Sequence, residues 1–550
     1  MTPGRRLLVA ALMIAPALSA AVAPAPAHAA PTQMSMMMDD NLLLYRSDHV
    51  AARTLTQMKA MGVDTVRVTV LWRTVAEFAH PRLRDIEKLK GKARSRAVRQ
   101  RHRFDADDPR TYPRGNWDRY DNLVKAATQR GLRVHFNVTG PGPIWAQRTP
   151  PKRLRRLLAS YKPKVGAFKQ FVKAVGRRFD GTYRDENGVR DVLPRVSMWS
   201  LWNEPNQAGW LSPQWERRNG RWVPAAPALF RRLVQQGYEG LVATGHRADN
   251  DLILLGETAP LGSGRRSERA PMYPKRFLRE LMCVRSDGRA YTGRSARLRN
   301  CGDFRKKGPL RASGYAHHPY TKNLAPTQRH RAADALTMAN ISELGALLDE
   351  LAAKTGNLPA GLPLYMTEFG YETSPPDRFS GVPPLAQATF NTLGEYLAWA
   401  DPRIAAQSQF LLADVAPLKQ HRKGTKSYWS TYQSGLITQQ GRAKLAAYAY
   451  VMPFMATRTT PDGAGVAATV NVWGQLRFLP NGQAGAVAIQ WRPRDGSAPW
   501  ATVGDRVATD PLGYYTAGRT APAAGAGEWR ALWSAGDRAD ELASLVVTGD

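Results

Sequence analysis

Two glutamates draw attention because each one ends a short apolar segment. Glu204 ends residues 198–204 (MWSLWNE), and Glu368 ends residues 364–368 (LYMTE). Two carboxyl groups that face each other across a sugar ring can cleave a glycosidic bond, because one protonates the leaving oxygen while the other attacks or activates water. Mutual repulsion also raises the pKa of one member of such a pair and keeps it protonated. Either glutamate alone also fits an ion pair or a helix cap.

Two further charged residues occupy similar segments. Glu257 ends the apolar residues 252–257 (LILLGE) and is a third acid that rivals the pair, either as a catalytic group or as a substrate ligand. Arg67 lies within the alternating residues 63–72 (VDTVRVTVLW). A guanidinium close to a carboxylate lowers its pKa, so Arg67 can hold one glutamate ionised. The alternative is an ion pair with a structural role only.

His318 and Tyr320 follow the apolar residues 314–317, and His317 is the adjacent alternative. A histidine pair can hold a metal, but no third ligand has suitable spacing. We therefore expect no metal and no organic cofactor.

Two tryptophans follow strand-like segments. Trp145 lies in residues 140–146 (GPGPIWA), and Trp210 comes six residues after Glu204. Indole rings stack on sugar rings, so both can line substrate subsites. Both can equally pack the loops that carry them.

The elements that must position these residues alternate between strand and helix patterns. About eight such units fill roughly 430 residues, which predicts parallel strands with crossover helices and hence a (β/α)8 TIM barrel. Enzymes with this fold carry their chemistry at the carboxyl ends of the strands, where the glutamates fall. An open doubly wound sheet is the runner-up, but no glycine-rich phosphate loop follows the first strand. The apolar or strand-like segments are 35–44, 63–72, 132–138, 196–202, 252–255, 314–317, 364–367 and 405–412, and the expected helices are 53–61, 116–130, 165–179, 227–244, 332–353, 385–400 and 441–452.

Residues 461–550 contain short alternating runs separated by proline, glycine and aspartate, a pattern that predicts an antiparallel β-sandwich. Five tryptophans lie in this segment, and exposed ones would offer a platform for sugars. We expect a core role instead, because Trp529, Ala531 and Trp533 share one strand face. The predicted domains are a catalytic barrel over 31–460 and an accessory sandwich over 461–550.

The first thirty residues predict a secretory signal peptide. Arg5 and Arg6 precede an apolar run that ends in Ala-His-Ala-Ala at 27–30, and a membrane anchor is disfavoured by the short run and the cleavage site. No later stretch is long and apolar enough for a transmembrane segment. We expect a secreted protein in which Cys283 and Cys301 form a disulfide.

The composition of the 550 residues is that of a globular chain, with 43% hydrophobic residues and a formal net charge of +33. Two cysteines exclude a disulfide scaffold and a four-cysteine zinc site. Basic residues cluster at 82–103, 148–178 and 265–311. Such charge fits nucleic acid, an anionic membrane or an anionic polymer. No nucleic-acid-binding motif is present, so we expect solubility and adhesion to an anionic cell-wall polymer, with an acidic substrate as the alternative.

The residues WNEPN at 202–206 and TEFGY at 367–371 resemble the acid/base and nucleophile strands of clan A retaining glycoside hydrolases, most closely families 5 and 39. The resemblance implies Glu204 as acid/base and Glu368 as nucleophile. Asn203 would then bind the substrate 2-hydroxyl, and Arg67 would keep the nucleophile ionised. His318 and Tyr320 match the family's His-x-Tyr, with the tyrosine near the nucleophile.

The chain departs from the family pattern at two strand ends. Family 5 commonly has a histidine after strand three, where this chain has Asn137 and Thr139. It also has a tryptophan after strand eight, whereas residues 407–414 contain none and Trp429 would have to fold back into that place.

The resulting expectation is a secreted retaining glycosidase that cleaves β-linked poly- or oligosaccharides. Retention requires carboxyl groups about 5–5.5 Å apart, whereas about 6.5–9.5 Å indicates inversion. Two alternatives are a non-catalytic carbohydrate-binding wall protein and a basic adhesin on the same barrel. The adhesin predicts binding that collapses with salt and does not need Glu204.

Overall fold

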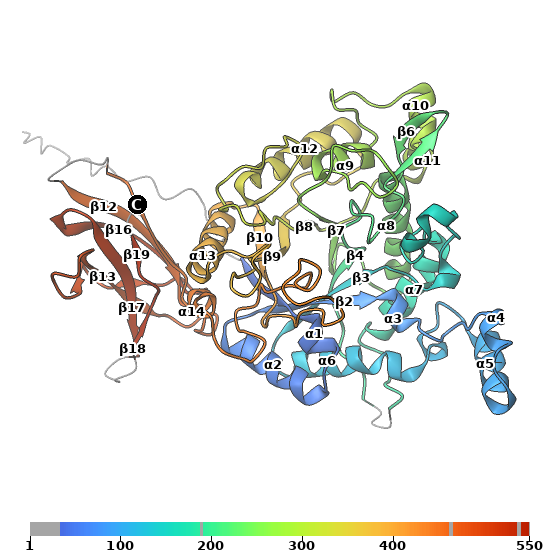
Figure 1. Cartoon of the computed structure of the whole chain (residues 1–550), viewed down its shortest axis with the longest axis horizontal. Helices are drawn as coiled ribbons and strands as arrows, with labels where there is room; N and C mark the ends of the chain where they lie inside the picture. Colours follow the sequence, from blue (N-terminus) through green and yellow to red (C-terminus); the bar gives the residue numbers. More distant parts are fainter. Residues whose placement is uncertain (1–32, 188–190, 461–465, 536–540, 549–550) are drawn as a thin grey trace, which may run out of the picture.

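The computed structural model describes residues 33–187, 191–460, 466–535 and 541–548. At its centre, eight parallel strands close into a barrel in the order β1-β10-β9-β8-β7-β4-β3-β2 (Figure 1). These strands are β1 (Met34–Met38), β2 (Thr65–Leu71), β3 (Arg133–Thr139), β4 (Met198–Leu201), β7 (Leu252–Thr258), β8 (Gly314–His317), β9 (Leu364–Phe369) and β10 (Ile404–Phe410). The predicted TIM barrel is therefore confirmed, and the open sheet is wrong. The expected signal peptide at 1–30 lies outside the described residues.

Helices surround the barrel because each one buries an apolar stripe against the strands. In α7, for example, Phe168, Phe171 and Val172 are buried at helical spacing, whereas Lys169 and Lys173 are only half-buried. The helices that follow the barrel strands include α2 (Asp48–Ala60), α6 (Asp118–Thr128), α7 (Val165–Arg178), α8 (Ala226–Val242), α9 (Pro274–Leu281), α12 (Ser342–Thr355), α13 (Pro384–Ala400) and α14 (Leu445–Val451).

Three segments differ from the sequence-based expectation. The apolar segment 35–44 is not one element, because Asp39 ends β1 and caps α1 (Asp40–Leu44) by accepting a hydrogen bond from the backbone of Leu42. Residues 332–341 precede α12 instead of belonging to it. The excursions between strands also carry elements of their own: α3 (Trp72–Val75), α4 (Leu83–Ile86), α5 (Gly91–Arg103), β5 (Trp215–Arg218), β6 (Arg221–Pro224), α10 (Gly293–Leu298) and α11 (Cys301–Lys307).

The C-terminal part consists of two antiparallel sheets that share a core, which confirms the predicted all-β sandwich. Buried side chains from both sheets meet there, among them Val470, Ile489 and Trp529. The strands are β11 (Phe454–Arg458), β12 (Ala467–Gln475) and β16 (Tyr514–Ala524) in one sheet, and β13 (Ala486–Pro493), β14 (Ala501–Thr502), β15 (Val507–Ala508), β17 (Gly527–Ser534), β18 (Glu541–Ala543) and β19 (Val547–Thr548) in the other. The domain boundary at 460/461 stays a prediction, and β11 pairs with β12 although it precedes that boundary.

The C-terminal tryptophans divide into two groups. Trp473, Trp491 and Trp529 are buried, as a core role requires. Trp500 and Trp533 are half-buried, and Trp500 has the guanidinium groups of Arg492 and Arg530 within 4.6 Å and 4.4 Å of its ring centroid. A sugar platform needs an open indole face, so these contacts favour the core role for the domain's tryptophans.

The sandwich packs beside α13 and α14 (Figure 1). Trp473 of β12 contacts Trp399 of α13, with ring centroids 5.8 Å apart. In the barrel domain, Cys283 and Cys301 form the expected disulfide. No helix among the described residues has the length and apolar character needed to span a bilayer.

Candidate active site

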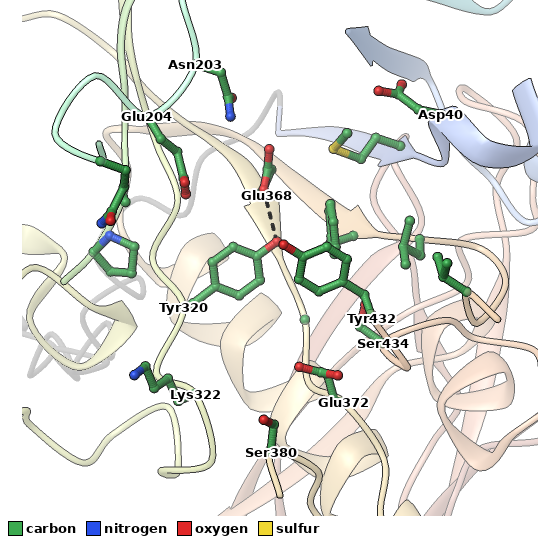
Figure 2. A pocket seen from close by; sticks show the side chains of 18 of the residues that line it. Asp40, Asn203, Glu204, Tyr320, Lys322, Glu368, Glu372, Ser380, Tyr432 and Ser434 are labelled. Carbon is green, nitrogen blue, oxygen red and sulfur yellow. Dashed lines mark hydrogen bonds between the residues drawn. The ribbon is translucent and has the colours of Figure 1, made fainter. Parts of the chain in front are cut away.

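The carboxyl ends of the barrel strands open into a cavity of about 750 Å³. Figure 2 shows Glu368, on β9, and Glu204, in the turn after β4, pointing into this cavity with Asn203 and Tyr320 beside them. The cavity lining includes Asp40, Asn203, Glu204, Trp210, Tyr320, Lys322, Glu368, Glu372, Ser380, Tyr432 and Ser434. The two glutamates that sequence analysis paired are therefore neighbours in the fold.

Glu204 reaches the cavity through a sharp turn after β4. Trp202 and Glu204 have φ angles of 77° and 37°, in the left-handed region that side chains rarely adopt. Backbone hydrogen bonds hold this turn, because Asn203 N–H donates to Thr139 Oγ1 and Glu204 N–H donates to the carbonyl of Glu257, both at 2.9 Å. Strained backbone of this kind costs about 1–3 kcal/mol per residue and concentrates at functional sites. Here it aims the Glu204 carboxyl across the barrel.

Arg67 of β2 joins three strand ends from below the cavity. Its guanidinium is fully buried and donates to Glu368 Oε1 at 3.0 Å, to Glu257 Oε2 at 3.0 Å and to Asn203 Oδ1 at 2.9 Å. The bond to Asn203 leaves the amide nitrogen of that residue free to donate to a ligand, and Figure 2 shows the nitrogen directed into the cavity. A planar guanidinium fixes several acceptors at once, which a lysine cannot do.

His318 is the second buried cation, and it contacts all three glutamates. Its Nε2 lies 2.7 Å from Glu257 Oε2, and its Nδ1 lies 3.1 Å from Glu204 Oε1 and 3.5 Å from Glu368 Oε2. Burial alone lowers a histidine pKa, but the surrounding carboxylates outweigh it and raise the pKa of His318 to about 10. The imidazole is therefore a cation at neutral pH.

The two buried cations affect the pKa of Glu257 more strongly than that of Glu368. Burial raises the pKa of Glu257, yet Arg67 and His318 outweigh burial and hold it well below its ordinary value. Burial also raises the pKa of Glu368, and there His318 and Arg67 only partly offset it. Arg67 thus acts on Glu368 in the expected direction. Two buried cations therefore face three carboxyl groups at this site, those of Glu204, Glu257 and Glu368.

The two glutamates also differ in what surrounds them. Oxygen atoms of Glu204 and Glu368 approach within 4.8 Å of each other. Glu368 accepts a hydrogen bond from Tyr320 Oη at 3.2 Å, drawn in Figure 2, and its side chain is 11% exposed. The Glu204 side chain is 21% exposed and reaches solvent more easily. Glu368 is therefore the more firmly held of the two carboxyl groups, and Glu204 is the more accessible one.

Glu204, His318 and Glu368 offer donor atoms close enough to hold a metal ion. A metal requires a neutral imidazole nitrogen, whereas both nitrogens of His318 face carboxylates and its pKa is raised to about 10. The donor set therefore fits a proton-bearing network better than a metal centre.

The other site residues predicted from the sequence differ in their position relative to the cavity. Trp210 lines the cavity. Glu257 is fully buried under it and accepts hydrogen bonds from Arg67 and Thr367, so it positions its neighbours and does not face substrate. Trp145 packs against Trp72, His80 and Phe104, away from the residues that line the cavity. Its loop-packing role is the one the structure supports.

His317 is separated from the site although it is adjacent to His318. It contacts Thr258 Oγ1 at 2.8 Å and the carbonyl of Leu336 at 3.0 Å, and burial lowers its pKa to about 3. It is a neutral structural residue. The open choice between the two histidines therefore falls to His318.

Sequence reasoning missed several cavity residues, and Asp40 and Tyr432 are two of them. Asp40 follows β1, and its carboxylate accepts a hydrogen bond from Thr69 N–H at 3.1 Å. The strand-end pattern that identified the glutamates also applied to this aspartate. Tyr432 comes from a loop after β10, where it packs against Phe410 with ring centroids 5.2 Å apart. Phe410 and Tyr432 thus lie at the carboxyl end of β10, the eighth barrel strand along the chain. Trp429 is not among the described residues that line the cavity.

The polar residues of β3, the third barrel strand, form hydrogen bonds with their neighbours. Asn137 Nδ2 donates to Ser200 Oγ and to the carbonyl of Trp202, and Thr139 holds Asn203. His135, on the same strand, is buried beside Ser200, and burial lowers its pKa to about 3.

No protein-family model matches the chain, and no curated protein matches it at a significant level. Solved structures resemble it distantly. An FMN-binding β-glucuronidase from Facaelibacterium prausnitzii L2-6 is 12% identical with a TM-score of 0.37, and the match covers 94% of this chain but 56% of that one. GH5_18 from Streptomyces cattleya in complex with GlcNAc is 16% identical over 77% and 79% of the two chains, with a TM-score of 0.39. The β-glycosidase from the hyperthermophile Thermosphaera aggregans is 13% identical over 76% and 95%, with a TM-score of 0.39.

Proposed function

We propose that the protein is a glycoside hydrolase that cleaves β-linked glycosides by double displacement, with Glu368 as nucleophile and Glu204 as acid/base. One observation carries this proposal: two carboxyl groups face one cavity, with oxygens within 4.8 Å, above the buried cations Arg67 and His318. The reaction needs one ionised carboxylate as nucleophile and one protonated carboxyl group as acid.

In the first step, a carboxylate oxygen of Glu368 attacks the anomeric carbon, and the bond to the leaving oxygen breaks. Glu204 gives its proton to that oxygen. In the second step, Glu204 takes a proton from water, the water oxygen attacks the anomeric carbon, and Glu368 leaves as a carboxylate. Both steps invert the anomeric centre, so the product keeps the configuration of the substrate.

The surrounding residues position this chemistry. Arg67 and Tyr320 hold the two oxygens of Glu368 in one orientation. His318 holds Glu204 through Nδ1, and Glu257 holds His318 through Nε2. The free amide nitrogen of Asn203 is available to the substrate hydroxyl next to the anomeric carbon, where a bond that strengthens in the transition state speeds the reaction.

The short approach between the carboxyl groups supports retention. Inverting enzymes separate the two groups by about 6.5–9.5 Å to admit a water molecule between sugar and base. An oxygen separation within 4.8 Å leaves no such room and fits direct attack by Glu368.

We also propose that the protein acts outside the cell. The predicted signal peptide at 1–30 supports export, and the pairing of Cys283 with Cys301 fits an oxidising compartment. The proposed substrate is a poly- or oligosaccharide of the surroundings or of a cell wall.

The test is turnover of a panel of aryl β-glycosides and β-linked polymers, with the first-formed anomer followed by NMR. We expect net retention, and loss of at least about a thousandfold in kcat for Glu204→Ala on poorly activated substrates and for Glu368→Ala on all. Glu372→Gln is the matched control, because it removes a cavity carboxylate outside the Arg67–His318 network. It should lose far less.

Azide separates the two roles. In Glu368→Ala it should replace the nucleophile and give the α-glycosyl azide, whereas in Glu204→Ala it should attack the intermediate and give the β-glycosyl azide. Inverted product from the unaltered protein, or full activity in Glu368→Ala, would overturn the proposal. Salt-sensitive binding without turnover of any substrate would favour the adhesin.

A further inference from the structure

A basic surface hollow lies apart from the catalytic cavity. Its volume is about 390 Å³, and every described residue that lines it is a cation: Lys152, Arg153, Arg155, Arg156 and Arg269. Four of them come from one short turn, η4 (Lys152–Leu157), in which Leu154 is buried and the charged side chains are exposed. The buried leucine fixes the turn, so the cations are presented as a group.

Little in the protein neutralises this group. Arg153 pairs with Glu268, and Arg269 donates to the carbonyl of Arg153 at 2.7 Å. Among the described residues, no ion-pair or hydrogen-bond partner contacts the side chains of Lys152, Arg155 and Arg156. Like charges held close together destabilise a fold unless a counter-charge is present, so the hollow is built for an anionic ligand.

Both walls of the hollow are tied to the loop that follows Glu204. Beyond η4, Ser160 Oγ donates to the carbonyl of Ala208 at 2.9 Å, and Ser212 N–H donates to the carbonyl of Ser160 at 2.9 Å. The same loop carries Trp210, which lines the catalytic cavity. The η4 turn is thus fixed against the wall of the cavity.

The second wall is fixed in the same way. Near Arg269, the carbonyl of Glu268 accepts a hydrogen bond from Gln214 N–H at 3.0 Å, and Met272 N–H donates to the carbonyl of Asn206 at 2.9 Å. Asn206 lies two residues after Glu204, so a ligand that spans the hollow and the cavity would cross one continuous loop that is hydrogen-bonded to both walls.

We propose that the basic hollow is a subsite for the negatively charged part of a polysaccharide whose adjoining sugars enter the catalytic cavity. The proposal rests on the proposed glycosidase function and narrows its substrate to polymers that carry carboxylate, sulfate or phosphate groups. Arginine is suited to such groups because its planar fork binds two oxygens at once. A single-stranded nucleic acid is the less suitable ligand, since such ligands are held by aromatic stacking and none of the described residues that line the hollow is aromatic.

The test compares two triple variants of the full mature protein. The first, Lys152→Gln/Arg155→Gln/Arg156→Gln, removes three cations from the hollow. The matched control, Arg94→Gln/Arg96→Gln/Arg99→Gln, removes the same charge from α5, an exposed basic helix with no buried residue. Both variants therefore change the net charge equally.

Binding is measured with polygalacturonate as the carboxylate probe, dextran sulfate as the sulfate probe and a neutral β-glucan as reference. At low ionic strength, the hollow variant should bind the anionic probes roughly tenfold more weakly, and the α5 control should change less than about twofold. The difference should disappear at about 1 M salt, where charges are screened within about 3 Å. Inorganic phosphate and single-stranded DNA, added as competitors, separate a free-anion or nucleic-acid site from a polysaccharide site.

Three outcomes would overturn the proposal: equal weakening by both variants, no weakening by the hollow variant, or tighter binding of DNA than of the polysaccharides with the same dependence on the hollow. Turnover of small neutral aryl β-glycosides should be unchanged in both variants. Absence of that turnover in the unaltered protein would overturn the glycosidase function, whereas the binding comparison does not depend on catalysis, so the two failures are distinguishable.

Discussion

Tyr320 donates its hydrogen bond to the oxygen of Glu368 that Arg67 does not contact. A hydrogen bond to an ionised group stabilises the ionised form, so its removal raises the pKa of the carboxyl. We predict that Tyr320→Phe shifts the acidic limb of the kcat/KM profile to higher pH and lowers kcat about tenfold or more. The measurement is the pH dependence of hydrolysis of an aryl β-glycoside.

Tyr432→Phe is the control for this variant, because Tyr432 faces the same cavity without a hydrogen bond to Glu368 among the described contacts. Its acidic limb should stay in place. An unmoved limb in Tyr320→Phe would mean that the tyrosine only packs beside the nucleophile.

Glu372 gives a second prediction, about stability. Burial, with Asp377 and Asp414 adding to it, raises the pKa of Glu372 from 4.5 to about 7. Between these values the folded state binds more protons than the unfolded state, so this group reduces stability as pH rises from about 4.5 to about 7. We therefore expect Glu372→Gln to raise Tm relative to the unaltered protein at pH 8 and to raise it less, or not at all, at pH 4.

Thermal unfolding at the two pH values measures this effect. The substitution keeps the local contact, because the Glu372 carboxyl accepts a hydrogen bond from Gln433 N–H and the amide oxygen of a glutamine accepts the same bond. A Tm difference of the same size at both pH values would contradict a titrating origin.

Site residues could be predicted where a charged side chain lies in a recognisable apolar strand or follows its end. Glu204, Glu368 and Arg67 lie on strands or directly after them, so the fold class alone brings them to one face. The contact between Glu257 and His318 could not be predicted, because sequence does not say which of several strand-end groups points up into the cavity and which lies under it. Tyr432 was missed because its loop carries no periodic pattern.

At the scale of elements, the disulfide fixes the excursion between β7 and β8. Cys283 and Cys301 close a loop of 18 residues that contains α10, and buried Arg231 donates to the carbonyls of Leu281 and Arg299 at the two ends of that loop. Closing a loop of this size stabilises a fold by roughly 3 kcal/mol through the unfolded state. We predict that Cys283→Ala/Cys301→Ala makes the loop sensitive to trypsin, which has many basic residues to cleave there.

Limited proteolysis followed by mass spectrometry checks this prediction. The first cuts should fall between residues 285 and 299, while hydrolysis of a small aryl glycoside is retained, because the described residues that line the catalytic cavity include none from this loop. First cuts elsewhere, with the loop intact, would contradict it. Reduction of the unaltered protein should reproduce the same fragments.

Helices and strands in which apolar residues recur at regular spacing were predicted well. The elements inserted between the barrel strands were not. The strand predicted over 314–317 and the helix over 165–179 match β8 and α7 within one residue, because apolar residues recur there at strand or helix spacing. The helix α5 was missed because it buries nothing, so no apolar stripe marks it. The hairpin of β5 and β6 was missed although Asn219 and Gly220, with φ angles of 51° and 76°, form the tight turn between its strands, a local signal that the sequence contains.

At the scale of the whole molecule, Arg477 is one of the side chains that connect the two domains. Arg477, between β12 and β13, donates to both oxygens of Glu395 on α13, at 3.1 Å and 2.5 Å, and to the carbonyl of Tyr450 on α14 at 2.9 Å. The backbone of Arg477 also lies against Gly62, where an added Cβ would stand 1.9 Å from its carbonyl oxygen. The sandwich is thus fitted to the barrel wall beside Gly62, which precedes β2.

This connection leads to a prediction about cooperativity. The side chains of Arg477 and Glu395 are only 6% and 11% exposed, so removing one partner leaves a buried charge, at a cost of about 3–5 kcal/mol. We predict that Arg477→Met lowers the temperature of unfolding and separates one calorimetric transition into two. The double variant Glu395→Met/Arg477→Met should recover most of the loss, because a paired apolar contact replaces the buried ion pair.

If both variants unfold like the unaltered protein, the ion pair is unimportant and the aromatic contact of Trp399 with Trp473 holds the domains together. Retained hydrolysis of small glycosides in Arg477→Met would then assign the sandwich to stability and not to catalysis.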